Sequence, residues 1–339
     1  MKPRYLYWSV MCVGLWAGSV GISAAAPTRA ATSGDSTPAR VPRLAGPWIR
    51  LTDRPPLERW GTPKAEPVDF TIFRAADGRW QLISCIRNTS YPGKGRLLYR
   101  WSSDRLTAPG WRADGIFLES QAEIGNAEGL MQAPHCVIDD GRYRLFYNST
   151  GAHVMTSSDG ITFTHHRTAN DYTLFKMGRD VMVFDDRARH NRWIAYYTAV
   201  VPGLNPRTRD HTVMVRTAPA LLGPWSAEEI DIGTPTEPPA GYLFAYAESP
   251  FVLEREGWYF RFEQMIVYAS RDPLKWSGPP VVSLIPNDPM RYLAPEIIVE
   301  GDREYIAAYG WRGNNPRGIF LAPIEWVESG AAAGTKDDR

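Results

Sequence analysis

Short runs of alternating apolar and polar residues fill the chain from about residue 46 to residue 327. Runs of roughly 4 to 8 residues with this alternation, bounded by Gly, Asp and Pro, are typical of β-strands. No segment in this span keeps a helical period for more than about three turns. The pattern therefore predicts an all-β protein.

The runs form a unit that occurs five times. Each copy opens with a strand near an acidic residue or an Ala-Pro pair, turns at Asp or Gly, and returns along an aromatic-rich strand. The opening strands are Val68 to Phe73, Ala133 to Ile138, Arg179 to Phe184, Glu248 to Leu253 and Ala294 to Val299. Copies spaced by roughly 45 to 70 residues are typical of propeller blades, so we predict a five-bladed β-propeller. The segment Trp48 to Thr52 is expected to pair with the last blade and close the ring.

A third strand and an outer element follow the hairpin in most copies, and the outer element carries an aromatic residue. These aromatics are Trp111, Phe163, Trp225 and Trp276. We expect each of them to pack back between two blades.

The N-terminus resembles a targeting segment. Lys2 and Arg4 precede an apolar stretch, and Ala24-Ala25-Ala26 offers small residues for cleavage. We predict a signal peptide over residues 1–26, a flexible linker over 27–45, the propeller over 46–327 and a polar tail over 328–339. The protein is then secreted or periplasmic, without stable membrane association once the leader is removed; a retained anchor is the alternative.

Composition excludes several classes of function. The 38 basic and 37 acidic residues leave a net charge of +1, and no run of like charge stands out, so a nucleic-acid partner is not expected. Outside the leader, Cys85 and Cys136 are the only cysteines. Two widely spaced cysteines form neither a disulfide framework nor a zinc site, and we expect buried thiols rather than a bridge.

The opening strands of a propeller line its central channel, so their first residues converge at one mouth. The same position in each copy reads Asp69, His135, Asp180, Glu248 and Glu296. Carboxylates forced together repel, which raises the pKa of some of them. Glycoside hydrolysis needs this combination of one protonated and one ionised carboxyl.

These motifs resemble a known superfamily. Arg179-Asp180 is similar to an Arg-Asp-Pro motif, with Val181 in place of proline, Glu248-Ser249-Pro250 is similar to Glu-Gly-Pro, and Ala133-Pro134-His135 is similar to Ala-Pro-Asp. The chain resembles, over about residues 46 to 327, the five-bladed propeller glycoside hydrolases of families 43 and 62 and of families 32 and 68. The resemblance implies Asp69 as base or nucleophile, Asp180 as the residue that orients the sugar and tunes pKa values, and Glu248 as general acid.

The remaining channel residues have open roles. We expect His135, Arg179, Glu296 and Trp311 to bind the carbohydrate substrate. His135 also fits a structural role or a metal or water site in the channel, and Glu296 fits a partner for an arginine such as Arg291. No cofactor is expected, although a structural metal ion in the channel stays an alternative.

Two further groups of residues are candidates for sugar contact. Trp60, Tyr246, Tyr292 and Trp311 lie near the ends of predicted strands and either stack on sugar or pack in the core. The loop Glu119 to Gln132, with Asn126 and Glu128, is expected to overhang the mouth.

Two other functions compete with hydrolysis. Phosphorolysis needs a basic cluster at the mouth, of which only Arg179 is evident in the sequence. A carbohydrate-binding propeller without catalysis is the second alternative, because a fold does not determine a function.

Overall fold

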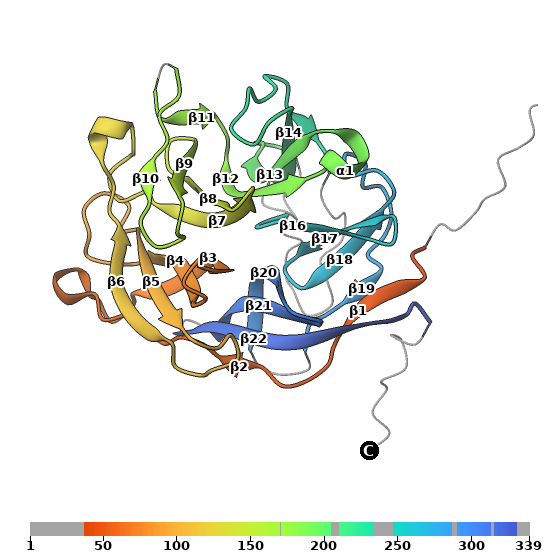
Figure 1. The fold of residues 1–339 in the computed structure, drawn as a ribbon, viewed down its shortest axis with the longest axis horizontal. Helices are drawn as coiled ribbons and strands as arrows, with labels where there is room; N and C mark the ends of the chain where they lie inside the picture. The colour runs from red at the N-terminus through yellow and green to blue at the C-terminus, as the bar shows by residue number, and fades with distance from the viewer. Residues whose placement is uncertain are drawn as a thin grey trace, which may run out of the picture. The chain divides into compact units, whose positions relative to one another are not determined.

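The computed structural model describes residues 37–169, 171–204, 210–233, 247–286, 290–312 and 315–330. Five antiparallel sheets stand around a central channel, and successive sheets follow the chain order around the ring (Figure 1). The predicted all-β fold and its five blades are confirmed. The predicted leader lies outside the described residues.

Each blade is a meander whose first strand lines the channel and whose last strand lies at the rim (Figure 1). Blade one contains β3 (Glu66–Arg74), β4 (Trp80–Arg87), β5 (Leu97–Ser103) and β6 (Arg112–Leu118). Blade two contains β7 (Gln132–Asp139), β8 (Arg142–Asn148), β9 (Ala152–Ser157), β10 (Thr164–His165) and β11 (Thr173–Phe175). Blade three contains β12 (Arg179–Asp185), β13 (Trp193–Val200), β14 (His211–Ala218) and β15 (Ile230–Asp231). Blade four contains β16 (Phe251–Arg255), β17 (Trp258–Glu263), β18 (Ile266–Ser270) and β19 (Val282–Ser283). Blade five contains β20 (Arg291–Glu300), β21 (Arg303–Arg312) and β22 (Asn315–Glu328), with β1 (Arg40–Leu44) and β2 (Ile49–Arg50) at its edge.

Helical structure is confined to short connections in the described residues: α1 (Arg187–His190) and the 3₁₀ turns Glu58–Trp60 and Ala122–Ile124. None of the helices in this part of the chain is long and apolar enough to cross a bilayer.

Local sequence explains the first hairpin of two blades. Asp140-Gly141 joins β7 to β8, and Glu256-Gly257 joins β16 to β17; all four residues have positive φ. Two-residue turns of this kind match the right-handed twist of the flanking strands. The predicted turn positions are therefore confirmed in both blades.

The N-terminal strands close the ring. β2 pairs with β22 as the sequence predicted, through Ile49 opposite Leu321. β1 also pairs with β22, from Arg40 opposite Glu328 to Leu44 opposite Ile324. The predicted linker over 27–45 is therefore wrong for residues 40–44. This segment forms a strand because its backbone pairs with the open edge of β22 and its Val41 side chain is buried, which the composition of residues 27–45 does not reveal.

Aromatic side chains fill the spaces between blades, as predicted. Trp111 packs in a cluster that joins blade one to blade five, and Phe163 packs where blade two meets blade one. Trp225 and Trp276 hold the corresponding places in the next two interfaces. Cys85 and Cys136 are free thiols, which confirms the prediction that they are not bridged.

Candidate functional site

An irregularity in the first strand of the blades shapes the mouth of the channel. The pairing between first and second strands shifts register there, which marks a β-bulge. The shifts fall at Pro67–Phe70, Gln132–His135, Arg179–Met182 and Leu293–Glu296. The second residue of the bulge has positive φ at Ala133, Asp180 and Ala294, and Ser249 adopts the same conformation just before β16.

The positions of the bulges show that one sequence prediction, the equivalence of the acids along their strands, is wrong. Asp69, Asp180 and Glu248 do not occupy the same position in their strands: Asp180 is the second bulge residue, whereas Asp69 is the third and Glu248 matches the first. His135 and Glu296 are both the fourth. The extra residue of a bulge resets the alternation of side chains, so counting along the strand misplaces them.

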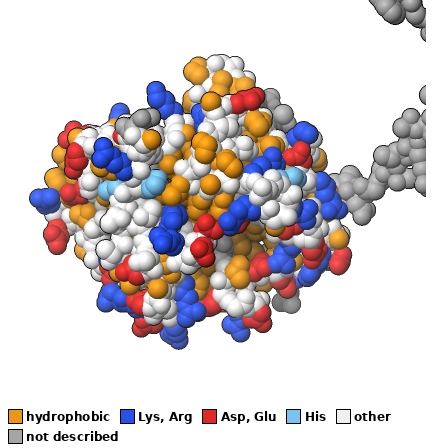
Figure 2. Space-filling model, turned by 45° about the horizontal axis from the view of Figure 1, so that its top comes forward, with side chains coloured by type: hydrophobic (Ala, Val, Ile, Leu, Met, Phe, Trp, Pro, Cys, Tyr) orange, Lys and Arg blue, Asp and Glu red, His pale blue; other side chains and the backbone are white. Residues whose placement is uncertain are grey.

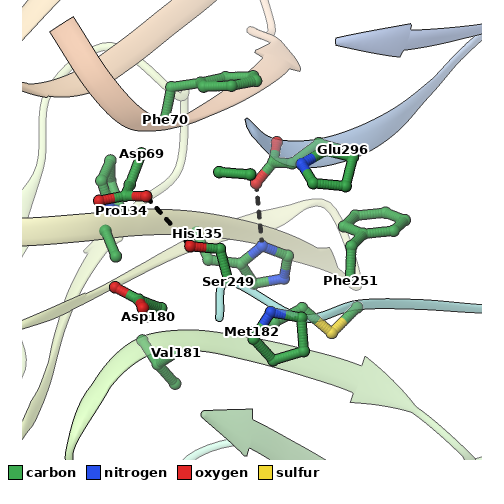
Figure 3. Close-up of a pocket in the computed structure, with 14 residues that line it drawn as sticks. Asp69, Phe70, Pro134, His135, Asp180, Val181, Met182, Ser249, Phe251 and Glu296 are labelled. Carbon is green, nitrogen blue, oxygen red and sulfur yellow. Dashed lines mark hydrogen bonds and ion pairs between the residues drawn. The ribbon is translucent and has the colours of Figure 1, made fainter. Parts of the chain in front are cut away.

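The structure nevertheless brings the three predicted carboxylates together. Ser249 Oγ lies 3.2 Å from Asp69 Oδ1, which places the turn after Glu248 against Asp69 (Figure 3). Arg179 Nε lies 3.2 Å from Asp180 Oδ2, and Arg179 Nη2 donates to Glu248 Oε1 at 2.6 Å. One guanidinium therefore joins the carboxylates of blades three and four.

The proximity of the acids changes their protonation. Burial raises the pKa of Asp69, and the charge of Glu248 raises it further. Burial also raises the pKa of Asp180 well above its usual range, and repulsion from Asp69 adds to the effect. The cluster therefore holds two carboxyls with raised pKa values, and perturbed groups of this kind are common at sites of acid–base chemistry.

Next to the carboxylates, at the inner end of the bulges, His135 and Glu296 form a pair. His135 Nδ1 lies 3.6 Å from Glu296 Oε1, and His135 Nε2 faces the backbone oxygen of Val183 at 3.2 Å (Figure 3). Burial raises the pKa of Glu296. In the tautomer whose Nε2–H donates to Val183, Nδ1 is the ring nitrogen that faces the Glu296 carboxyl. Glu296 also interacts with the Thr71 hydroxyl and the Ile72 backbone, which lower its pKa as His135 does. Its pairing with an arginine such as Arg291 stays a prediction.

A small cavity lies at this level of the channel, with a volume of about 30 Å³. That is room for about two water molecules. Its lining includes the fourth bulge residues Phe70, His135, Met182 and Glu296, together with Phe251 at the start of β16 (Figure 3). The described residues hold no group of three or more His, Cys, Asp or Glu side chains arranged to ligate a metal ion.

The mouth includes residues that sequence reasoning missed. Tyr309 ends near the cluster: burial raises its pKa, and the charges of Asp69 and Glu248 raise it further. His211 Nε2 lies 3.3 Å from Arg179 Nη2. The charges of Arg96 and Arg87 both lower the pKa of Asp69. All four stand where second strands end or third strands begin, and antiparallel pairing returns these points to the mouth.

The aromatic candidates have different surroundings. Tyr292 is buried and stacks on Trp48 with 3.9 Å between ring centroids, so it is a core residue. Trp311 is half-buried at the mouth end of β21, and the Arg291 guanidinium lies 5.8 Å from its ring centroid. Trp60 is half-buried too, and its Nε1 donates to Glu119 Oε1 at 2.6 Å. Tyr246 lies outside the described residues.

The predicted loop over the mouth turns two of its polar side chains inward. Gln132 Oε1 accepts a bond from Asn148 at 2.9 Å, and Asn126 Oδ1 accepts the backbone N–H of Gln121 at 3.2 Å. Both side chains are buried. They brace the loop. One face of the molecule shows mixed basic and acidic side chains around a central hollow (Figure 2).

No protein-family model matches the sequence, and no curated protein is significantly similar to it. Solved structures are similar in fold. A thermostable family-43 glycoside hydrolase has a TM-score of 0.58 and 16% identity, over 80% of this chain and 91% of that one. The catalytic domain of a family-62 α-L-arabinofuranosidase from Coprinopsis cinerea has a TM-score of 0.53 and 12% identity, over 81% and 96% of the two chains. A family-117 glycoside hydrolase from Zobellia galactanivorans has a TM-score of 0.55 and 12% identity, over 86% and 92%. At these identities the likeness establishes that the chain has the five-bladed propeller fold these glycoside hydrolases share.

Proposed function

We propose that the protein is a secreted or periplasmic glycoside hydrolase acting on a plant- or microbe-derived oligo- or polysaccharide. The observation that carries the proposal is the meeting of Asp69, Asp180 and Glu248 around one arginine at the channel mouth. Hydrolysis of a glycosidic bond uses a protonated and an ionised carboxyl side by side. The fold, shared with several glycoside hydrolases, supports the same reaction.

In the proposed mechanism Glu248 protonates the leaving glycosidic oxygen. Arg179 donates to Glu248 in the unliganded protein, and the same guanidinium already lies 3.2 Å from Asp180 Oδ2. Arg179 therefore has to turn from Glu248 toward Asp180 before Glu248 carries the proton. Asp69 then attacks the anomeric carbon or removes a proton from the attacking water, while Asp180 binds a sugar hydroxyl.

The first experiment is a panel of arabinan, xylan, galactan and fructan, with the matching p-nitrophenyl glycosides, assayed for new reducing ends. We expect release of sugar from at least one member, and NMR of the first product anomer will show retention or inversion. Binding to a glycan without any product would favour the non-catalytic propeller and overturn the proposal.

Two variants test the roles. Glu248→Gln is expected to abolish cleavage of the polysaccharide but to retain part of the rate on p-nitrophenyl glycosides, whose leaving group needs no proton. Asp69→Asn is expected to lose at least about 10³-fold on both kinds of substrate, because it removes the base or nucleophile. Full activity of either variant would contradict its assigned role.

Phosphorolysis is the second candidate, and one observation favours it. Arg87, Arg96 and Arg179 all act on the charge of Asp69. Arg87 pairs with Glu66, but the Arg96 side chain has no ion pair or hydrogen bond with the described residues. A guanidinium of this kind suits a phosphate oxyanion. Release of a sugar 1-phosphate that depends on added inorganic phosphate would identify this reaction; free sugar at the same rate without phosphate identifies hydrolysis.

A further inference from the structure

Asp180 and Ser249 lie at equivalent positions in blades three and four and share an uncommon backbone conformation. Asp180 has φ of +61° and Ser249 has φ of +51°. Residues other than glycine seldom occupy this left-handed region, and they stay there only where the surroundings hold them. The two equivalent residues in blades two and five, Ala133 and Ala294, are alanines, so only blades three and four carry a polar side chain at this position.

In both blades, a buried side chain of the preceding blade holds the strained residue. The N–H of Asp180 donates to Asn148 Oδ1 at 3.0 Å, and Asn148 Nδ2 donates in turn to Gln132 at 2.9 Å. The N–H of Ser249 donates to Thr198 Oγ1 at 3.1 Å. Asn148 and Thr198 are both 0% exposed. Each is at the mouth end of a second strand and reaches across to the next blade.

Thr198 touches more of the cluster than Asn148 does. It stands directly opposite Arg179 in the ladder between β12 and β13. The Ser249 residue whose N–H it accepts also reaches Asp69 Oδ1 with its hydroxyl, at 3.2 Å. The path Thr198, Ser249, Asp69 thus connects blade three to the acid of blade one through the turn that follows Glu248.

We propose that Thr198 is the positioning residue of this site, whose hydroxyl holds the Glu248–Ser249 turn of the next blade against Asp69. The catalytic consequence rests on the proposed glycosidase function; the positional one does not. Thr198 touches neither sugar nor reacting atoms in this scheme, since it is fully buried and its hydroxyl accepts the N–H of Ser249.

The test compares three variants of the full chain. Thr198→Val keeps the side-chain shape and removes the hydroxyl, whereas Thr198→Ser keeps the hydroxyl. Thr52→Val is the matched control: Thr52 is also buried, and its Oγ1 accepts the backbone N–H of Ile319 at 3.2 Å where the ring closes. Any general effect of losing a buried threonine hydroxyl will appear in the control.

The first readout is the ionisation midpoint of Asp69, followed by ¹³C NMR of labelled aspartate carboxyls and assigned with Asp69→Asn. We expect Thr198→Val to raise the midpoint by about half a pH unit or more, because a released turn weakens the bond from Ser249 to the ionised Asp69. Thr198→Ser and Thr52→Val should leave it near the wild-type value. An unchanged midpoint in Thr198→Val, or the same rise in Thr52→Val, would overturn the proposal.

The second readout is the rate on p-nitrophenyl α-L-arabinofuranoside, or the p-nitrophenyl glycoside from the panel that the wild type cleaves. We expect Thr198→Val to lower kcat by about 10- to 100-fold with little change in KM, because a small displacement of the acids lowers the rate strongly. Thr198→Ser should recover most of the rate. If the wild type cleaves none of these glycosides, the proposed function fails, and the NMR midpoint still decides whether Thr198 holds the Glu248–Ser249 turn against Asp69.

Discussion

Arg179 donates twice to the same oxygen of Glu248, from Nη2 at 2.6 Å and from Nε at 3.2 Å. Its Nε lies equally close, at 3.2 Å, to Asp180 Oδ2. A planar guanidinium spans two carboxylates in this way, and a lysine ammonium, a single point charge, is a poor substitute. The unliganded site is therefore held by a cation that has to release one acid when substrate arrives.

Removing Arg179 should leave the repulsion between the carboxylates of Asp180 and Glu248 without a compensating positive charge. We expect Arg179→Met to destabilise the protein by about 2 to 3 kcal/mol at pH 7, less than a fully buried pair because Glu248 is partly exposed. Without Arg179 the folded-state pKa of Asp180 rises further. The stability loss should therefore be largest above that pKa and should shrink as the pH falls toward the ordinary value of an aspartate. Thermal unfolding from pH 4 to pH 8 measures this.

The control for Arg179 is Arg189→Met, which removes an exposed ion pair with Glu254. Exposed pairs contribute about 0 to 1 kcal/mol, so its Tm should change little at any pH. A loss in Arg179→Met that does not depend on pH would contradict the electrostatic explanation.

Asp180→Asn should stabilise the protein at neutral pH. Burial and Asp69 raise the folded-state pKa of Asp180 well above its unfolded value. Such a group favours folding below the unfolded pKa and loses that contribution as the pH rises through the folded one. We expect the amide substitution to raise Tm by several degrees at pH 7 and by almost nothing near pH 3 to 4. Equal Tm values of the variant and the wild type at pH 7 would show that the carboxylate has no electrostatic cost.

Blade four contains a buried ion pair of its own, between Arg261 and Glu263. Arg261 Nε lies 2.8 Å from Glu263 Oε1, with side chains 2% and 1% exposed. The Arg261 guanidinium also lies over the rings of Tyr268 and Trp276, at 5.1 and 4.9 Å. Burial raises the pKa of Glu263 to about 6. The contribution of Glu263 to stability is therefore complete below about pH 4.5 and is lost as the pH rises through 6.

Single and double substitutions of this pair should behave differently. Arg261→Met leaves the Glu263 carboxyl buried without its counter-charge and should cost about 3 to 5 kcal/mol. Arg261→Met with Glu263→Leu removes both charges and should be close to neutral or stabilising. Chemical denaturation of the wild type and these variants measures the difference, and additive effects of the two changes would contradict a coupled pair.

Strand β1 should be needed for stability although its sequence reads as linker. A chain that starts at Gly46 lacks the pairing of Arg40–Leu44 with β22 and the buried side chain of Val41. It also leaves part of the β22 edge open. We expect a Tm several degrees lower and more aggregation than for a chain that starts at Thr37. Identical melting and solubility of the two chains would show that β1 contributes nothing.

Much of the fold was predictable because it repeats. Alternation, turn residues and outer aromatics identify a blade, and five copies agree with one another even where a single copy is ambiguous. The start of the ring was mispredicted at β1 because that strand depends on the open edge of β22, which lies at the other end of the chain.

The candidate site, too, was predictable from the sequence only in part. Sequence alone predicted which acids enter the mouth, since Asp69, Asp180 and Glu248 all lie near the start of a predicted first strand. Only the tertiary structure decided their positions, because a bulge adds a residue to four of the five first strands and turns the following side chains to new directions. It also decided their partners: Arg179, Thr198 and Tyr309 reach the acids from second strands or neighbouring blades, and contacts between blades follow from the closure of the ring, which no local pattern encodes.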